Sequence, residues 1–503
     1  MNETSVAIEV NWWVVGSFAA YILMLIGIAG YCARTQAGNL TDFFIGGRKM
    51  KSAVVALSAV TSGRSGWLVL GVTGLAFIDG AAAVWSVVGY TVVELFLFLF
   101  LAPRMRRFTG RMRDITLTDY FVSRLGGGNR LRLLIVAVLV LFMVAYVSSQ
   151  FQAGGTAFAG TFGVSSDLGI LITAGVVLAY TAIGGYVALA LSDFVQAVLM
   201  LFGLVVLPIV VVWSLGWTPM VDTINALNPA MFDPWAVGFG AIIAGVGIGL
   251  GSPGQPHIVV RYMSVDDPRS LRPAALWGTF WNVLMGWGAV FIGLAGRAVY
   301  QDVDALPNGD AEQLFPFLAN EYLPSLIVGL LVAAVFSAIM STADAQLLVG
   351  SSGVVRDVYH RMLKRGQEVS PRKLVMVSRI VVLGMSVFAV GMLYIPGVEQ
   401  AVFYLVLFAW AGLGAAFGPP LVMSIFWRGM TAAGAAAGIV VGAAVTIAWY
   451  FTLADVLYEL VPGAIASTLA VWLVSLYTQK PERVEEKFAI MSGEDREDES
   501  VRD

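Results

Sequence analysis

The sequence is nearly devoid of the side chains that bind transition metals or form disulfides. Its 503 residues include one cysteine, Cys32, and two histidines, His257 and His360, which lie far apart in the chain. A single cysteine excludes an intramolecular disulfide, and two distant histidines make no metal-binding motif. The sequence also contains no nucleophile–base set and no phosphate-binding loop. We therefore expect neither an enzyme nor a cofactor-binding protein.

Charged residues are also scarce. They make up 13% of the chain, against about 25% in soluble proteins, whereas hydrophobic residues make up 58%. The apolar runs are long enough for helices that cross a bilayer, which need about 20 residues each. The first run, from Trp12 to Tyr31, lacks the basic start of a signal peptide and is predicted to be a membrane helix. These features predict an all-α, multi-pass protein of the cell membrane.

The apolar runs predict about 13 transmembrane helices. Their approximate ranges are 11–32, 53–78, 82–102, 133–160, 165–183, 188–214, 235–256, 273–297, 323–358, 373–394, 398–426, 431–452 and 456–477. If the N-terminus lies outside, the connecting segments that face outward contain no lysine or arginine. Of the 30 basic residues, Arg64 and Arg297 alone are then away from the cytoplasmic face. This asymmetry predicts an outside N-terminus and a cytoplasmic C-terminus.

Two of the predicted spans are interrupted. The first contains the polar stretch Ser58–Trp67, which includes Arg64, and the second contains a run rich in glycine and proline at 247–256. A guanidinium at mid-membrane costs about 2.5–3.5 kcal/mol on insertion scales. Non-helical backbone at that depth has to be buried in protein or line a cavity. Both interruptions are therefore predicted to line a site.

Each interrupted span begins a set of five spans, and the two sets have opposite orientations. Interrupted helices at matching places in inverted halves are typical of secondary transporters with a site at the membrane midplane. The alternative is that the glycines only allow close helix packing. The predicted organisation is an N-terminal helix and linker, a first repeat, an extracellular linker, a second repeat, two C-terminal helices and a disordered cytoplasmic tail. Their ranges are 1–52, 53–214, 215–234, 235–426, 427–477 and 478–503.

Five motifs resemble those of the sodium:solute symporter family, and in particular of its sodium/proline symporter branch. They occur in the family's order and are Asp42–Arg48, Ser65–Trp67, Tyr180–Tyr186, Gly254–Met263 and Met340–Leu348. The resemblance covers about residues 12 to 477. It implies a LeuT-like core of five plus five helices, with one helix before the core and two after it.

The resemblance also implies an importer that works by alternating access and is driven by sodium. The family's sodium site matches backbone carbonyl or hydroxyl groups of Thr61, Arg64, Ala338, Ser341 and Thr342. Alternatively, the hydroxyls of Ser341 and Thr342 bond carbonyls one turn back in their own helix. No metal other than sodium is expected.

The substrate implied by the resemblance is a small amino or imino acid, or a similar zwitterion or carboxylate. The residues expected near it are Ser65, Gly66, Trp67, Tyr146, Gln150, Ile248, Ser252 and Pro256. Ile248 and Ser252 stand where the branch has aromatic residues, so half of an aromatic cage is missing. Gln150 can instead bond a neighbouring helix, and Trp67 and Tyr146 can instead serve packing.

A further departure from the branch lies at Gly63 and Arg64, where sodium/proline symporters carry an aspartate and an apolar residue. Two positive charges about 4 Å apart repel by roughly 4 kcal/mol at an effective dielectric constant near 20. Arg64 therefore replaces the sodium ion, binds a substrate carboxylate, or pairs with an acid and leaves sodium binding intact. The candidate acids are Asp344, Asp193 and Glu94, and we favour an Arg64–Asp344 pair.

Two classes of function remain after these considerations. The first is a symporter whose partners are a small-molecule substrate, Na+ or H+ and membrane lipids, with no nucleic acid. In a sodium-independent version, Arg64 replaces the cation and Glu94 or Asp344 relays a proton. The second is a solute sensor, against which the lack of an appended signalling domain argues.

Overall fold

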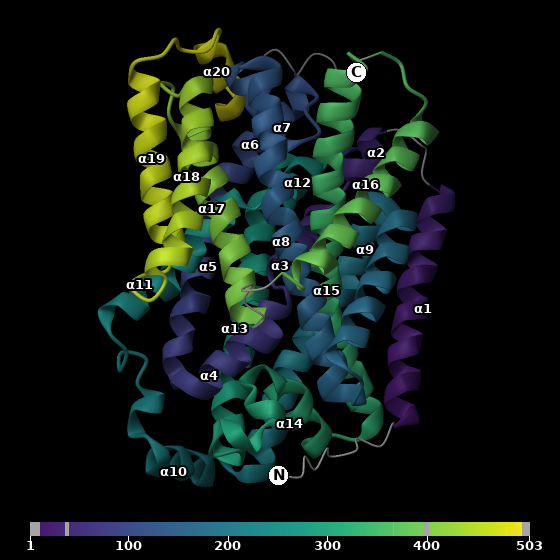
Figure 1. Ribbon diagram of the computed structural model, residues 1–503, viewed down its shortest axis with the longest axis vertical. Helices are drawn as coiled ribbons and strands as arrows, with labels where there is room; N and C mark the ends of the chain where they lie inside the picture. Colours follow the sequence, from purple (N-terminus) through teal and green to yellow (C-terminus); the bar gives the residue numbers. More distant parts are fainter. Residues whose placement is uncertain (1–10, 36–39, 366, 396–401, 495–503) are drawn as a thin grey trace.

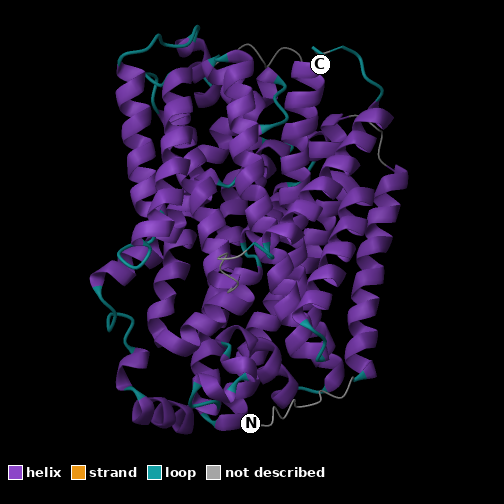
Figure 2. Cartoon of the chain, viewed as in Figure 1, coloured by secondary structure: helices purple, strands orange, loops and turns teal. Residues whose placement is uncertain are grey.

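The computed structural model describes residues 11–35, 40–365, 367–395 and 402–494. Within these ranges the chain is helical and contains no strand (Figure 2). The helices of the first half are α1 (Trp12–Thr35), α2 (Leu40–Ile45), α3 (Ser52–Gly63), α4 (Thr73–Asp79), α5 (Val84–Phe96), α6 (Ala102–Met112), α7 (Leu117–Leu125), α8 (Gly128–Phe162), α9 (Ser166–Leu215) and α10 (Trp217–Leu227). Those of the second half are α11 (Phe239–Gly247), α12 (Pro256–Ser264), α13 (Leu271–Val299), α14 (Leu314–Tyr322), α15 (Ser325–Ser352), α16 (Pro371–Met392), α17 (Val402–Phe426), α18 (Ala432–Leu453), α19 (Leu460–Leu476) and α20 (Val484–Ser492).

The helices form an elongated bundle whose two ends differ. Helices α10 and α14 lie at one end, and α6, α7 and α20 lie at the other (Figure 1). In the described ranges, nine helical stretches are long and apolar enough to cross a membrane. The prediction of an all-helical membrane protein is confirmed.

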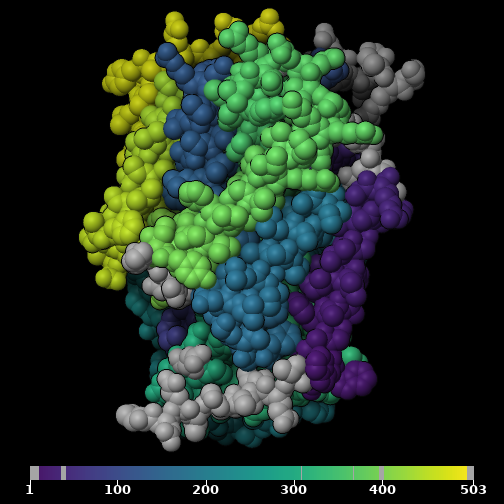
Figure 3. Space-filling view, turned by 45° about the vertical axis from the view of Figure 1, so that its right-hand side comes forward, coloured from purple at the N-terminus to yellow at the C-terminus, as the bar shows by residue number. Residues whose placement is uncertain are grey.

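Helix α15 is at the centre of the bundle and α1 is at its edge. Of the 18 most apolar consecutive residues in the stretch that contains α15, 83% are buried, whereas the share for α1 is 22%. Figure 3 shows α1 on one side of the molecule and the C-terminal helices on the other. A helix that is apolar on all sides is expected in the core of a bundle.

Both predicted interruptions are present as breaks in helices. Helix α3 ends at Gly63, Arg64 is non-helical with φ −113° and ψ 63°, and helical structure resumes at Trp67 in the segment η2 (Trp67–Val72). In the second half, α11 leads into the tighter segment η6 (Ile248–Gly254), and Gln255 is extended with φ −91° and ψ 99° before α12. Proline at the first position of α12 suits a helix start, because its nitrogen has no hydrogen to leave unpaired.

The prediction of disorder throughout 478–503 is wrong for Val484–Ser492, which form α20. This helix packs on α6, and Arg107 donates hydrogen bonds of 3.2 Å to its last two carbonyls. The ring of Phe488 faces the guanidinium of Arg124 at 4.8 Å. Contacts with residues far away in the chain therefore stabilise a segment whose local sequence, rich in charge, indicates disorder.

Candidate functional site

Helix α15 places the hydroxyl group of Thr342 beside the break that follows α3. Thr342 Oγ1 donates to the carbonyl oxygen of Ser62 at 2.9 Å, so this hydrogen bond joins two helices. Ser341 Oγ donates to the carbonyl oxygen of Ala338 at 3.2 Å, within its own helix. All four residues are buried. Ser341 thus makes the hydrogen bond within its own helix that was the alternative prediction, whereas the hydroxyl of Thr342 links α15 to the first break.

The backbone at the break supplies the other predicted sodium-side groups. The N–H of Arg64 donates to the carbonyl oxygen of Thr61 at 3.0 Å and closes the last turn of α3. Of the next two carbonyls, that of Ser62 accepts Thr342 Oγ1 and that of Gly63 accepts Arg64 Nη1, as helix-end carbonyls often accept side-chain donors. In transporters with broken helices, such carbonyls are typical ligands of Na+. The structure thus places the predicted residues of α3 and α15 next to each other.

A small cavity lies on the other side of the break. Its lining residues are Gly63, Arg64, Trp67, Tyr90, Tyr146, Ile248, Val406, Leu407 and Trp410. The cavity therefore lies between both broken helices, α5, α8 and α17. Trp67, Tyr146 and Ile248 were predicted from the sequence, whereas Tyr90 and the three residues of α17 were missed. Aromatic residues inside apolar spans gave no signal that separates a cavity wall from ordinary packing.

Trp410 is the main residue that sequence reasoning missed. Its Nε1 donates to the carbonyl oxygen of Ile248 at 2.8 Å, and its ring lies 6.4 Å from that of Tyr146 in an edge-to-face arrangement. The indole of α17 therefore contacts the second break, at the position where the expected aromatic side chain is absent. Gln255 Nε2 also donates to the Trp410 carbonyl at 3.0 Å and fixes this contact.

The remaining predicted substrate-side residues mostly support the breaks. Gln150 Oε1 accepts the N–H of Gly66 at 3.1 Å, so this side chain of α8 satisfies the backbone of the first break. Ser65 Oγ accepts the N–H of Trp67 at 3.2 Å. Ser252 is buried, and its hydroxyl has no hydrogen bond to a described residue. A buried hydroxyl without a partner is unusual and marks Ser252 as a group available to a ligand.

Arg64 is paired with Glu94 of α5. Its Nη2 lies 2.6 Å from Glu94 Oε2, and its Nε donates to Asn282 Oδ1 at 3.0 Å. Asn282 in turn donates to Glu94 Oε2 at 2.7 Å. The guanidinium also lies 3.6 Å from the centre of the Tyr90 ring, and Nη1 donates to the Gly63 carbonyl at 3.0 Å. The positive charge is therefore neutralised inside the protein.

The favoured Arg64–Asp344 pair is wrong, because Glu94 occupies the position of the partner. Asp344 is fully buried, and neither of its carboxylate oxygens makes a hydrogen bond to a described residue. Pairing depends on the direction in which each helix presents its side chains, and the sequence does not show that direction for α5 or α15.

A second buried ion pair holds both broken helices to α9. Arg261 of α12 contacts Asp193 of α9 with 2.8 Å between Nη2 and Oδ2, and its Nε donates to Ser58 Oγ of α3 at 2.6 Å. Both charged side chains are almost fully buried. From the sequence we placed Arg261 in a connecting segment at the cytoplasmic face, whereas the structure places it within α12 with its side chain buried. Its position inside the Gly254–Met263 motif was the available signal.

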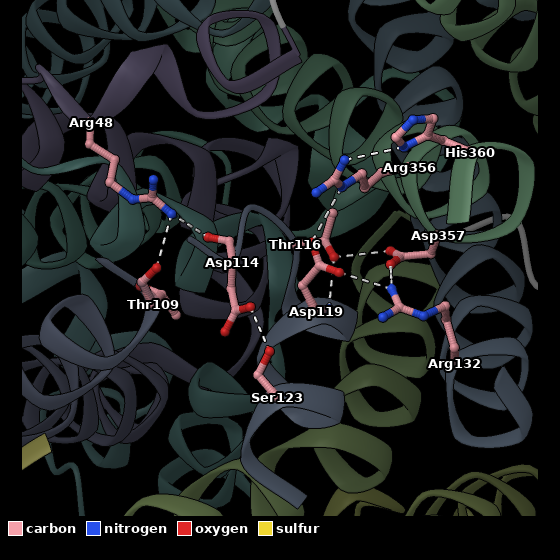
Figure 4. A network of polar contacts seen from close by, with 10 residues as sticks. All are labelled: Arg48, Thr109, Asp114, Thr116, Asp119, Ser123, Arg132, Arg356, Asp357 and His360. Atoms are coloured by element: carbon pink, nitrogen blue, oxygen red, sulfur yellow. Dashed lines mark hydrogen bonds and ion pairs between the residues drawn. The ribbon is translucent and has the colours of Figure 1, made fainter. Parts of the chain in front are cut away.

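Figure 4 shows polar contacts of charged residues on and beside α7, which lies at the end of the molecule with α6 and α20 (Figure 1). Arg132 of α8 pairs with Asp119 of α7 at 2.9 Å and with Asp357, which follows α15. Arg48 donates to the backbone carbonyl of Asp114 at 2.5 Å. Ser123 Oγ donates to Asp114 Oδ1 at 2.7 Å. The arginines were predicted from the sequence only as markers of the cytoplasmic side, whereas the structure places them in two groups of polar contacts, one around Asp114 and one around Asp119 and Asp357.

Asp114 is expected to make stability depend on pH. Burial raises the pKa of this carboxyl to about 7, against the opposing effect of the Ser123 hydrogen bond. In the unfolded chain the pKa is about 3.9. Near pH 4 the burial of this carboxyl therefore lowers the free energy of unfolding very little. As the pH rises to 8, the unfolded chain loses this proton before the folded protein does, and the free energy of unfolding falls by up to about 4 kcal/mol. Thermal unfolding in detergent between pH 5 and 8 measures this fall.

The Asp114→Asn variant should lose most of that slope, and its free energy of unfolding should come closest to that of the unmodified protein at the acid end of the range. Asp266→Asn is the control, because Asp266 is exposed on the same end of the molecule and should leave the slope unchanged. An unchanged slope in Asp114→Asn would contradict the assignment.

Comparison with known proteins places the chain among membrane transporters. A profile of the Sodium:solute symporter family matches residues 43–442. The high-affinity proline transporter PutP of Bacillus subtilis (strain 168) is 38% identical over 459 residues, which cover 90% of this chain and 96% of that protein. The sodium/proline symporter of Staphylococcus aureus (strain JH9) is 36% identical over 489 residues, which cover 94% of each chain.

Two solved structures resemble the fold. A substrate-bound, outward-open Na+-coupled sialic acid symporter superposes with a TM-score of 0.78 at 19% identity, over 94% of this chain and 99% of that one. A nucleobase-cation-symport-1 family transporter in a closed conformation gives a TM-score of 0.55 at 16% identity, over 90% and 99% of the two chains. At these identities the likeness concerns the fold alone.

Proposed function

Because the chain belongs to the sodium:solute symporter family, we propose that it imports proline or a closely related small zwitterion together with Na+. The protein is a multi-pass, sodium-coupled solute symporter and not an enzyme. Proline is proposed because relatives with 36–38% identity over at least 90% of the chain are named for its transport. Transport by alternating access follows from the two broken helices that meet at the cavity.

The observation that favours sodium coupling is the ion pair between Arg64 and Glu94. An unpaired guanidinium beside the site would repel a cation by several kcal/mol. Since Glu94 and Asn282 hold that charge, the site retains no net charge from Arg64. We therefore assign Na+ to the backbone groups of Thr61, Arg64 and Ala338 and to the hydroxyls of Ser341 and Thr342, and sodium-independent transport becomes the weaker alternative.

The substrate is proposed to bind in the cavity beside the first break. Trp67, Tyr146 and Trp410 provide aromatic surfaces for an aliphatic ring, and Trp410 compensates for the missing aromatic residue at Ile248. The buried hydroxyl of Ser252, at the second break, makes no hydrogen bond to a described residue and suits a polar group of the substrate. In this conformation the cavity has room for about one water molecule, so its walls have to move apart before the substrate binds.

We further propose thirteen spans arranged as an inverted repeat, with the N-terminus outside and the C-terminus inside. The 50 residues of α9 would extend about 75 Å, more than twice the bilayer core of about 30 Å. Gly185, with φ 62° and ψ −175°, divides this helix into two spans. Gly80, with φ 65°, separates α4 from α5 in the same way. The proposed repeats are 53–214 and 235–426, and the linkers and terminal regions keep the boundaries given above.

Uptake into proteoliposomes tests the proposal. Radiolabelled proline and a panel of amino acids and carboxylates are supplied with an inward sodium gradient, with sodium replaced by choline under a proton gradient, and with neither. We expect concentrative proline uptake with sodium alone. Uptake that is indifferent to sodium would contradict the coupling, and rejection of proline with uptake of another compound would contradict the substrate.

The Thr342→Ala variant is expected to raise the sodium concentration for half-maximal uptake by about 10-fold or more, because one ligand is lost. Thr446→Ala is the matched control: Thr446 is also a buried helical threonine, and it bonds the Gly442 carbonyl of its own helix at 2.9 Å. If both variants reach half-maximal uptake at the same sodium concentration, the assignment of Thr342 as a sodium ligand is contradicted.

A further inference from the structure

Helix α20 connects elements of both halves of the bundle at the end of the molecule where α6 and α7 lie (Figure 1). Lys487 Nζ donates to the carbonyl oxygen of Arg124 in α7 at 3.2 Å. The centre of the Phe488 ring lies 4.8 Å from the Arg124 guanidinium and 4.9 Å from that of Arg428, which follows α17. Together with the hydrogen bonds from Arg107 of α6, these contacts make α20 a bridge between α6, α7 and the end of α17.

The anchor of this bridge is a buried arginine without an acidic partner. Three of the four arginines that are buried in the described part of the chain form ion pairs with acids, namely Arg64, Arg132 and Arg261. The fourth, Arg124, is fully buried, and its Nη1 and Nη2 make no hydrogen bond to a described residue. The negative face of the Phe488 ring therefore stabilises a charge that no described carboxylate neutralises. Such a cation–π contact is strongest where water is excluded.

The charges at both ends of α20 favour the same placement. Its first turn contains Glu485 and Glu486, and acids are favourable at the positive N-terminus of a helix. Glu485 also pairs with Arg428 at 3.0 Å. At the negative C-terminus, Arg107 donates to two carbonyls that lack partners within the helix. Contacts with three other elements thus hold a helix of nine residues in place.

The elements that α20 connects lead directly to the cavity. Helix α6 continues α5 through the segment η4 (Leu97–Leu101), and Tyr90 of α5 lines the cavity. Helix α17 contributes Trp410 to the cavity wall, and its Ser424 carbonyl accepts Arg124 Nε at 3.1 Å near the other end. Because the cavity is nearly closed, opening it toward α20 requires these two walls to separate, and α20 joins them.

From this geometry we propose that α20 is a strap across the cytoplasmic end of the transporter, that Phe488 anchors it, and that it restrains the opening of the cavity toward the cytoplasm. The strap stabilises the states that are closed on the inside, so weakening it shifts the population toward inward-open states. The inference rests on the proposed orientation and on alternating access, but not on the identity of the substrate or the coupling ion.

Cysteine accessibility in inside-out membrane vesicles tests the strap. Because the chain has a single cysteine, Cys32, a Cys32→Ser background can carry one reporter, Val406→Cys, in the buried wall of the cavity. A membrane-impermeant maleimide is added at the cytoplasmic face. Phe488→Leu keeps an apolar side chain but removes the ring, and it should label roughly 10-fold faster because both cation–π contacts are lost. Phe488→Tyr retains an aromatic ring and should label at about the parental rate.

The matched control is Phe451→Leu, the same substitution at a phenylalanine of α18 that is 72% exposed. It should leave the labelling rate unchanged. In right-side-out vesicles, Phe488→Leu should label no faster than the parent, because a shift toward inward-open states does not open the outer path. Arg428→Met removes one of the two cations beside the ring and should accelerate labelling from the inside by a smaller factor.

Two results would overturn the proposal. One is an unchanged rate from the cytoplasmic face in Phe488→Leu protein that retains the thermal unfolding midpoint of the parent. The other is equal acceleration from both faces, which would indicate general loosening of the bundle. If Phe488→Leu does not fold, Arg428→Met decides by the same two criteria. A failure of the proline or sodium proposal leaves the strap intact, because the reporter requires neither substrate nor a sodium gradient.

Discussion

Replacing Arg64 by methionine should sharply reduce the amount of folded protein, and adding Glu94→Gln should restore it. In the single variant, Glu94 keeps its charge in a buried position with Asn282 as its remaining polar partner. Breaking a buried ion pair in this way costs about 3–5 kcal/mol, whereas replacing both partners is often neutral. Glu94→Gln alone leaves the guanidinium of Arg64 unpaired and should be similarly damaging. Size-exclusion profiles and thermal unfolding midpoints in detergent measure the effect.

The control for this experiment is Arg428→Met. Arg428 pairs with Glu485 at 3.0 Å, but both side chains are exposed, at 62% and 77%. An exposed pair contributes at most about 1 kcal/mol, so this variant should remain folded. Equal loss of folded protein in Arg64→Met and in the double variant would show that Arg64 acts through more than its pairing with Glu94.

The double variant also separates structure from coupling. If the ion pair serves the structure alone, the Arg64→Met/Glu94→Gln protein should take up substrate at about the same sodium concentration as the parent. A methionine at position 64 would restore the apolar character that the sodium/proline symporter branch shows there. A large change in the sodium requirement, with folding intact, would instead place Arg64 or Glu94 in the coupling mechanism.

The sequence alone predicts the breaks because their signals are local. Glycine, proline and serine interrupt two apolar spans, and backbone at mid-membrane tolerates such runs only beside a site. The motif Met340–Leu348 likewise places Thr342 on a helix that faces the first break. These predictions need no knowledge of how the helices rotate about their axes.

Partner choice inside the membrane is a different problem. Arg64, Glu94 and Asp344 occur in three apolar spans, and their pairing depends on which face each helix turns inward. A rotation of one residue changes that direction by about 100°. The structure turns Glu94 and Asn282 toward Arg64, whereas nothing local in the sequence distinguishes Glu94 from Asp344.

Contacts between segments far apart in the chain could not be predicted either, because they also depend on how the helices pack in space. Trp410 reads as a packing residue of an apolar helix until its contact with Ile248 is known. Glu312 reads as an outer-loop acid until the N-terminus of α17 is placed beside it. Helix α20 has nine residues, too few to be stable alone, and it depends on packing against α6 and on the hydrogen bonds from Arg107 to its C-terminal carbonyls.

Replacing Arg261 by lysine is expected to have the second large effect, a loss of uptake. Its guanidinium contacts Asp193 of α9, Ser58 of α3 and the His257 carbonyl of its own helix, so one side chain links the inner halves of both broken helices to α9. A lysine retains the positive charge but lacks the planar fork that makes three directed contacts. We expect Arg261→Lys to fold and to lose uptake by about 10-fold or more, corresponding to about 1.4 kcal/mol or more of misplaced contacts.

The matched control is Arg356→Lys. Arg356 also pairs with an aspartate, Asp119, but the contact is longer, at 3.5 Å, and the arginine side chain is 14% exposed. Because a long, partly exposed ion pair depends less on the shape of the guanidinium, Arg356→Lys should retain most of the uptake. Uptake per folded protein and the thermal unfolding midpoint are measured for both. If Arg261→Lys transports at the parental rate, the three contacts of Arg261 serve only to neutralise Asp193, and its geometry is irrelevant to transport. If uptake falls while the midpoint stays unchanged, the fork itself coordinates the movement of the two broken helices against α9.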